Sequence, residues 1–262
     1  MTDQLRALLS ERGRAWPGPI EHFETLTSTS DRLKEMARAG APEWTVVVAD
    51  RQTGGRGRQG NAWISPVGNL FLSVLLKPPI HAAAAGLLPL AAGGAVCEAV
   101  RALGAPATVK WPNDVLVGER KVAGVLAEAT WVDRALDSVV VGVGVNVVLS
   151  PRELPPDLRD VTTSLAAEAS GSTDRDGAAA EVLERLTVWY HTLAAEAAMI
   201  VEAWRALSVP WWGRRVEVRS GDATLVGVAQ GVDDRGALLL RLDDGRVATV
   251  LAGEARRLRL DR

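Results

Sequence analysis

The last fifty residues carry the pattern that most constrains the fold. Short apolar stretches alternate there with turn signals at Ser220-Gly221-Asp222, Asp234-Arg235-Gly236 and Asp244-Gly245. Short strands separated by turns of this kind are typical of a small β-barrel. We therefore predict an all-β part that begins near Trp211-Trp212-Gly213. Its strands are expected at 216–219, 223–232, 237–242, 247–251 and 256–260.

The preceding residues mix helical and strand patterns, which predicts an α+β fold. Ser28-Thr29-Ser30 offer N-cap candidates for a helix that ends at Gly40, and apolar spacing predicts a long helix over 176–208. Further helices are expected within 1–20 and at 82–103. Strands are expected at 45–50, 69–77 and 138–149, and as a pair within 110–128 that turns at Gly118-Glu119. These patterns divide the chain into a short N-terminal segment (1–20), a mixed domain (21–210) and the barrel (211–262).

Composition argues against several classes of protein. The 262 residues include 30 basic and 32 acidic ones, and a net charge of −2 lacks the basic footprint of a nucleic-acid binder. A single cysteine, Cys97, excludes an intrachain disulfide and a cysteine metal cluster. We expect no membrane-spanning helix, because the nearest stretch, His81–Val100, contains Pro89 and Glu98. The N-terminus lacks a signal-peptide pattern, so we expect a cytoplasmic protein.

Protein nucleophiles are scarce along the chain. Cys97 lies in an apolar run, where a free cysteine usually serves packing. The three histidines, His22, His81 and His191, are far apart and have no metal-ligand spacing. Any chemistry is therefore expected to depend on positioning and charge stabilisation.

A glycine-rich loop at residues 54–60 is the first candidate for a binding element. Its four glycines allow the backbone N–H groups to converge on an anion, and Arg56 and Arg58 add guanidinium donors. A flexible surface loop with solvated arginines explains the same composition. The loop is not a P-loop, because the Gly-Lys-Ser/Thr ending is missing.

Lysines mark the second candidate. Only four residues are lysine, and two of them, Lys110 and Lys121, flank the segment Trp111-Pro112-Asn113-Asp114. A lysine, an amide and a carboxylate suit a nucleotide phosphate with Mg²⁺, although an ordinary turn after a strand is the alternative. The other two lysines, Lys34 and Lys77, match no motif, and we expect them on the surface.

Alternating glycines mark the third candidate. In Val141-Gly142-Val143-Gly144-Val145-Asn146, a strand would place both glycines on one face and the valines on the other. Two glycines on one face leave a flat slot in which a ring could lie. A strand packed closely beneath a helix is the alternative.

Together these segments resemble biotin protein ligases. The matching motifs, in order, are Ser28-Thr29-Ser30, Gln52 with Gly55–Gly60, Trp63, Lys110–Asp114, Lys121–Glu128 and Gly142–Asn146. The resemblance covers about residues 22–262. It implies a catalytic domain like those of class II aminoacyl-tRNA synthetases and biotin synthetases, with a mixed sheet flanked by helices, followed by an SH3-like barrel.

The resemblance also implies a reaction and its ligands. Biotin and ATP would give biotinyl-5′-AMP, and biotin would then pass to a lysine of a biotin carboxyl carrier protein, such as that of acetyl-CoA carboxylase. Mg²⁺ would accompany ATP. By the family's motifs, the catalytic residues would be Lys121, Arg58 and Asp114, and Asp114 would bind the metal. Biotin would be bound by Ser28, Thr29, Ser30, Gln52, Arg56, Gly57, Arg58, Lys121, Gly124, Gly142 and Gly144. ATP would be bound by Arg58, Trp63, Lys110, Asn113, Asp114, Lys121 and Asn146, with Trp63 near the adenine.

Two positions depart from the family pattern. Ser30 stands where the family usually has asparagine, and Gln59 where the loop often has a basic residue. Only about 20 residues precede the match, so the resemblance is to the monofunctional form without a DNA-binding domain. We expect no nucleic-acid or membrane partner, and either a monomer or a homodimer. A lipoate-type ligase and a non-catalytic biotin sensor remain alternatives.

Overall fold

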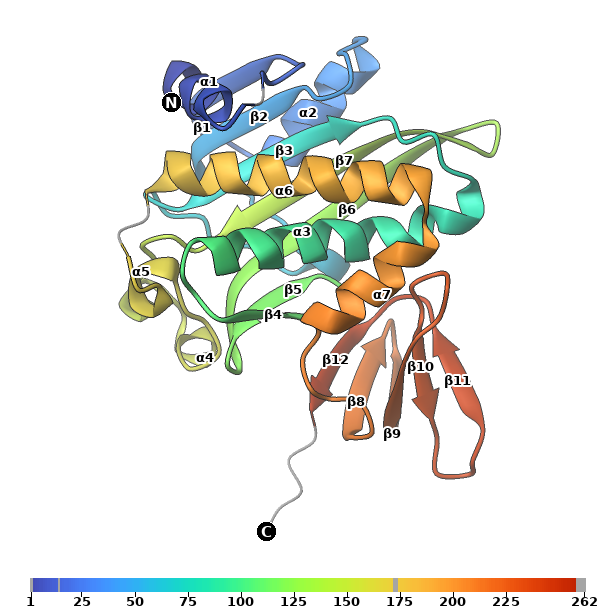
Figure 1. Ribbon diagram of the computed structural model, residues 1–262. Coiled ribbons are helices and arrows are strands. Elements are labelled where there is room, and N and C mark those ends of the chain that lie inside the picture. Colours follow the sequence, from blue (N-terminus) through green and yellow to red (C-terminus); the bar gives the residue numbers. More distant parts are fainter. Residues whose placement is uncertain (1, 14, 172–173, 258–262) are drawn as a thin grey trace.

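Two β-sheets organise the chain (Figure 1). The computed structural model describes residues 2–13, 15–171 and 174–257. The larger sheet has seven strands in the order β1-β2-β3-β7-β6-β5-β4. Its strands are β1 (Ile20–Leu26), β2 (Val46–Gln52), β3 (Leu70–Leu76), β4 (Ala107–Lys110), β5 (Asp114–Val117), β6 (Arg120–Val132) and β7 (Ala135–Val145). β1 pairs parallel to β2 and the other neighbours are antiparallel, so the sheet is mixed.

Helices cover both faces of this sheet, as the α+β prediction requires. On one face, α3 (Leu88–Ala102) and α6 (Arg175–Ala195) lie side by side, and α1 (Thr2–Glu11) packs on α6 (Figure 1). On the other face lies α2 (Thr29–Arg38), whose Leu33 packs against Val47, Leu75 and Val140. Shorter helices connect the elements: η1 (Arg58–Gly60), η2 (Ala82–Leu87), η3 (Pro151–Glu153), α4 (Pro156–Arg159) and α5 (Leu165–Glu168).

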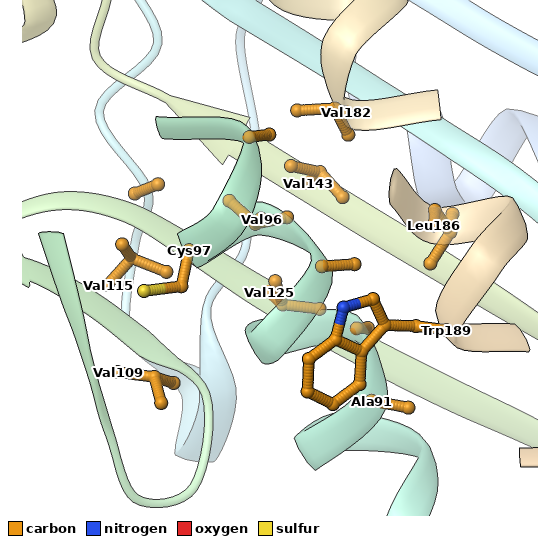
Figure 2. Packing of buried hydrophobic residues seen from close by; sticks show 14 of the residues in the cluster. Ala91, Val96, Cys97, Val109, Val115, Val125, Val143, Val182, Leu186 and Trp189 are labelled. Atoms are coloured by element: carbon orange, nitrogen blue, oxygen red, sulfur yellow. The ribbon is translucent and has the colours of Figure 1, made fainter. Parts of the chain in front are cut away.

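The main core lies between the sheet and the α3–α6 pair. Figure 2 shows Val96 and Cys97 of α3 and Trp189 of α6 beside Val125 and Val143 of the sheet. All of β3 is buried, which explains its nearly continuous apolar sequence. Gly94 of α3 lets Trp189 approach closely, since a Cβ at Gly94 would lie 2.4 Å from the Trp189 ring.

The second sheet confirms the predicted all-β C-terminal part. Its five antiparallel strands follow the order β11-β10-β9-β8-β12. They are β8 (Arg215–Ser220), β9 (Ala223–Val232), β10 (Leu238–Arg241), β11 (Val247–Val250) and β12 (Glu254–Arg257). The strand expected at 256–260 therefore begins two residues earlier, and residues 258–260 lie outside the described part of the chain.

Several elements differ from the sequence prediction. β1 and β4 were not predicted as strands of their own, and β7 ends at Val145 rather than at residue 149. The long helix expected over 176–208 is interrupted, because Glu196 leaves helical geometry at φ −151° and ψ 81°. The chain then resumes as α7 (Ala198–Leu207), which packs against β4 and whose Arg205 donates to the Val232 carbonyl of the C-terminal sheet.

One helical stretch, Ala84–Ala102, is long and apolar enough to cross a membrane by length and composition. In the fold it packs against α6 and β6, and 67% of its most apolar window is buried. Its apolar character is therefore accounted for by its place in the core.

Candidate active site

A cleft opens on the α2 face of the seven-stranded sheet. It encloses about 910 Å³ of empty space, including its open mouth. Five regions line it: the start of α2, the glycine-rich loop with Trp63, the Trp111–Asp114 turn, strands β6 and β7, and Gly253-Glu254 before and at the start of β12. Of the sequence-predicted site residues, all except Lys110 and Asn146 line this cleft.

The sheet places the two glycines of β7 as the alternation predicted. Val141, Val143 and Val145 belong to the core beneath α3 and α6, whereas Gly142 and Gly144 face the cleft. A Cβ at Gly142 would lie 2.5 Å from Ser30 Oγ, and one at Gly144 would lie 2.5 Å from the Trp63 ring. Both positions therefore require the absence of a side chain.

Polar side chains from three elements meet at the end of the cleft near α2. Ser28 caps the helix and is buried. The Thr29 backbone N–H and hydroxyl donate to Gln52 Oε1 at 2.8 and 3.2 Å, and Ser30 Oγ lies 3.0 Å from Ser73 Oγ. Ser73 on β3 had no motif to mark it, although it also donates to Thr29 Oγ1 at 2.8 Å. This network restricts the rotamers of the polar side chains that line this end of the cleft.

Trp63 lies across the floor of the cleft. A Cβ at Gly124 would meet its ring at 3.0 Å, so the indole covers Gly124 as well as Gly144. Lys121 Nζ is 5.1 Å from the ring centroid, within the range of a cation–π contact. The Trp63 Nε1–H has no hydrogen-bond partner within the described chain. Trp63 thus offers an apolar surface to the cleft while its Nε1–H is buried against Gly144, and its predicted place near an adenine stays a prediction.

Asp114 holds two ammonium groups at the other end of the cleft. Its Oδ2 is 2.7 Å from Lys110 Nζ and its Oδ1 is 2.5 Å from Lys121 Nζ. Burial alone would raise the pKa of this carboxyl, but the charges of Lys121 and Lys110 outweigh burial and lower its pKa to about 2. The three side chains therefore carry a net charge of +1, which suits an anionic ligand.

Strand pairing brings these three residues together. Lys110 and Asp114 are cross-strand partners in the β4–β5 hairpin, and Asp114 pairs with Gly124 of β6. The Lys121 backbone is held from the other side, because its N–H donates to Val161 O at 2.8 Å and its C=O accepts from Thr163 N at 2.9 Å. The Lys121 side chain is 34% exposed and reaches the cleft.

Asn146 and Asn113 are tied to the backbone. Asn146, 3% exposed, donates from Nδ2 to the carbonyls of Thr163 at 2.9 Å and Lys121 at 3.4 Å. It is not among the residues that line the cleft, and its predicted role as a nucleotide contact stays a prediction. Asn113 lines the cleft, and its Nδ2 donates to Val125 O.

Arg58 links the glycine-rich loop to the C-terminal sheet. Its Nη1 donates to the Gly253 carbonyl at 3.1 Å. Burial lowers the pKa of Arg58, while the charges of Asp114 and Glu254 oppose that shift. Gly253 and Glu254 belong to no sequence motif considered above, and only the fold reveals that they line the cleft.

Lys34, which was expected on the surface, is only partly exposed and is paired with two carboxylates. Its side chain is 22% exposed, and its Nζ lies 2.9 Å from Asp31 Oδ1 and 3.0 Å from Glu128 Oε1. Lys77, by contrast, is exposed as expected.

The described residues do not form a metal site around Asp114. Both of its carboxylate oxygens are already paired with ammonium groups. No group of three Asp, Glu, His or Cys side chains with the arrangement of a metal site occurs within the described ranges. Metal ligation by Asp114 therefore stays a prediction, and it would require a rearrangement of the ion pairs with Lys110 and Lys121.

Comparison with known proteins identifies the family. Residues 22–146 match the model of the biotin/lipoate A/B protein ligase family, and residues 212–255 match the biotin protein ligase C-terminal domain. The chain therefore belongs to the class of biotin and lipoate protein ligases.

Individual relatives narrow this class further. The chain is 35% identical to the biotin–[acetyl-CoA-carboxylase] ligase of Mycobacterium tuberculosis, over 98% of both chains. It is also 35% identical to the bifunctional ligase/repressor BirA of Bacillus subtilis, over 86% of this chain and 70% of that one. Its structure resembles the Aquifex aeolicus biotin protein ligase in complex with biotin and ATP, with a TM-score of 0.79, 31% identity, and 92% and 99% coverage. The chain belongs to the biotin protein ligase family.

Proposed function

We propose that this chain is an ATP-dependent biotin protein ligase that activates biotin as biotinyl-5′-AMP and transfers it to a lysine of a carrier domain. The observation that carries the proposal is a cleft in which a glycine-faced strand lies beside the Lys110–Asp114–Lys121 cluster. The two glycines let Ser30 and the Trp63 ring lie against the sheet at the floor of the cleft, and the cluster offers positive charge for phosphates and a carboxylate. Family membership supports the same assignment.

The first step brings together two anions, the biotin carboxylate and the α-phosphate of ATP, and positive charge in the cleft reduces their repulsion. A biotin carboxylate oxygen attacks the α-phosphorus of ATP, a new P–O bond forms, and pyrophosphate leaves. Lys121 and Arg58 both line the cleft and place positive charge where negative charge accumulates. Asp114 holds both lysine side chains in place through its two ion pairs. Side chains of this chain hold and polarise the substrates, and no covalent enzyme intermediate is needed.

The second step uses a nucleophile from the carrier. The carrier lysine attacks the acyl carbon of the mixed anhydride as a neutral amine, the C–O bond to AMP breaks, and the amine proton is lost. Among the described residues that line the cleft there is neither cysteine nor histidine, which agrees with a nucleophile supplied by the substrate. We further propose that the protein acts in the cytoplasm as a monomer or homodimer, without nucleic-acid or membrane partners.

Ligase activity is tested by incubating the pure protein with biotin, ATP, Mg²⁺ and an apo carrier domain. We expect biotin-dependent pyrophosphate release and a carrier whose mass rises by one biotinyl group. Absence of both would refute the proposal, and pyrophosphate release rules out a sensor that only binds biotin.

A lipoate ligase is the nearest alternative, because one matched family model covers both activities. The second match, to a biotin protein ligase C-terminal domain, favours biotin. The two alternatives are distinguished by measuring pyrophosphate release, without a carrier protein, in the presence of biotin, of lipoate and of both acids together. We expect biotin to be used at concentrations at which lipoate gives no release.

A further inference from the structure

Arg56 of the glycine-rich loop is held by two carboxylates from outside the loop. Its Nη2 lies 2.5 Å from Asp31 Oδ1 on α2 and 3.4 Å from Glu128 Oε2 on β6. Arg56 lines the cleft and is at the same time anchored to the helix and the sheet that form its walls. The loop is thus fastened on this side by charge.

Lys34 completes a ring of four charges. Its Nζ contacts the same two carboxylates, Asp31 at 2.9 Å and Glu128 at 3.0 Å. Each cation therefore touches both anions, and the signs alternate around the ring with no net charge. The ring joins α2, the loop and β6, which are far apart in the sequence. We call these four side chains the latch.

The opposite side of the loop is fastened separately. There, Arg58 donates to the Gly253 carbonyl at 3.1 Å. The loop therefore crosses the cleft between two attachments, one to α2 and β6 and one to the C-terminal sheet. Opening the cleft requires that at least one attachment breaks.

We propose that Asp31, Lys34 and Glu128 are positioning residues that hold the glycine-rich loop over the cleft through Arg56. By keeping the loop in place, the latch retains the bound acyl-adenylate until the carrier arrives. Retention of the adenylate rests on the proposed ligase function, whereas fastening of the loop does not. Asp31 and Lys34 are three residues apart on α2, so one helical turn presents both to the loop.

The latch acts as a network and is sensitive to salt. A single exposed ion pair contributes little. Here four contacts share four side chains that are 22% to 41% exposed, so each charge is held by two partners. Screening at about 1 M salt shortens the range of charge interactions to about 3 Å. High salt is therefore expected to loosen the loop.

Trypsin measures the state of the loop directly, because it cleaves after Arg56 and Arg58. We expect Asp31→Asn/Glu128→Gln, which removes both negative charges that face Arg56 and keeps acceptor oxygens there, to raise the rate of cleavage about fivefold at low salt. In about 1 M NaCl the wild-type rate should approach that of the double variant, whose own rate should change little. Cleavage after Arg246, which is 79% exposed in the β10–β11 turn, serves as an internal reference.

Matched variants separate the latch from general destabilisation. Glu35→Gln removes a 63% exposed carboxylate of α2 that pairs with Arg32, and it should leave loop cleavage unchanged. Lys34→Met should speed loop cleavage, because Asp31 and Glu128 then repel each other, and Lys34→Arg should restore the wild-type rate. Thermal unfolding of each variant shows that the fold is intact.

Two results would overturn the latch. The first is loop cleavage that is equal in wild type and double variant at low salt. The second is an equal effect of Lys34→Met and Lys34→Arg. In the ligase assay, the double variant should release more free biotinyl-5′-AMP per biotin transferred. Salt-sensitive cleavage in a protein without ligase activity would keep the latch and refute only the proposed function.

Discussion

Asp114→Asn tests the charge balance of the cleft. The carboxylate is 12% exposed at its side chain and holds Lys110 at 2.7 Å and Lys121 at 2.5 Å. The amide has nearly the same shape but leaves two ammonium groups without a counter-charge. Removing one partner of a buried ion pair costs about 3 kcal/mol or more. We expect a loss of about 3 kcal/mol in the free energy of unfolding at pH 7.

The pH dependence follows from the lowered pKa of Asp114. Its pKa is about 2, against an ordinary 3.8, so the folded state favours the charged form. At about 1.36 kcal/mol per pKa unit, ionisation of Asp114 contributes about 2 kcal/mol above pH 4. This contribution is lost as the pH falls from about 4 toward 2, and only about 1 kcal/mol of it remains at pH 3.

Urea unfolding followed by tryptophan fluorescence at pH 7 and pH 3 measures this effect. Other carboxylates titrate in both proteins, so the difference between wild type and variant isolates Asp114. We expect that difference to shrink by about 1 kcal/mol at pH 3. Asp222→Asn, in an exposed turn between β8 and β9, is the control and should show no change. An equal difference at both pH values would refute the reasoning.

Three further predictions follow from single contacts. Lys121→Arg should reduce biotin-dependent pyrophosphate release at least tenfold and change the melting temperature little. A planar guanidinium cannot replace the compact ammonium that lies between Asp114 and the Trp63 ring. A variant that releases pyrophosphate at the wild-type rate would contradict this. Arg58→Gly removes the attachment to Gly253, so we expect adenylate to escape and to label unrelated proteins, as detected by an avidin blot. Gly94→Ala places a methyl group 2.4 Å from the Trp189 ring and should cost about 2 kcal/mol in urea unfolding, despite the better helix propensity of alanine.

Much of the site could be predicted from the sequence because its residues cluster in short motifs. Lys110 to Lys121 span one β-hairpin and its neighbour strand, so spacing along the chain translates into proximity. The alternation of valine and glycine in β7 likewise determined which side chains face the core. Glu254 could not be found in this way, because its approach to Arg58 depends on how the C-terminal sheet docks on the larger one.

The missed elements have local physical reasons. β1 carries an irregular mixture of polar and apolar residues and is recognisable only through its parallel pairing with β2. The β6–β7 hairpin turns at Asp133-Arg134, both with positive φ and neither of them glycine, so the usual turn signal is absent. The break between α6 and α7 contains neither proline nor glycine. The contact between Lys34 and Glu128 escaped detection because α2 and β6 are far apart in the sequence.

The first helix has a practical consequence for anyone who wishes to trim this protein. Leu5 and Leu9 of α1 are buried at 0% and 1% exposure, and Arg12 pairs with Glu181 of α6. A shortened form that starts at β1 would expose the apolar surface of α6 and leave Glu181 with one cation fewer. The smallest form that does not aggregate at high concentration is therefore expected to include α1. An affinity tag at the N-terminus is better joined through a polar spacer.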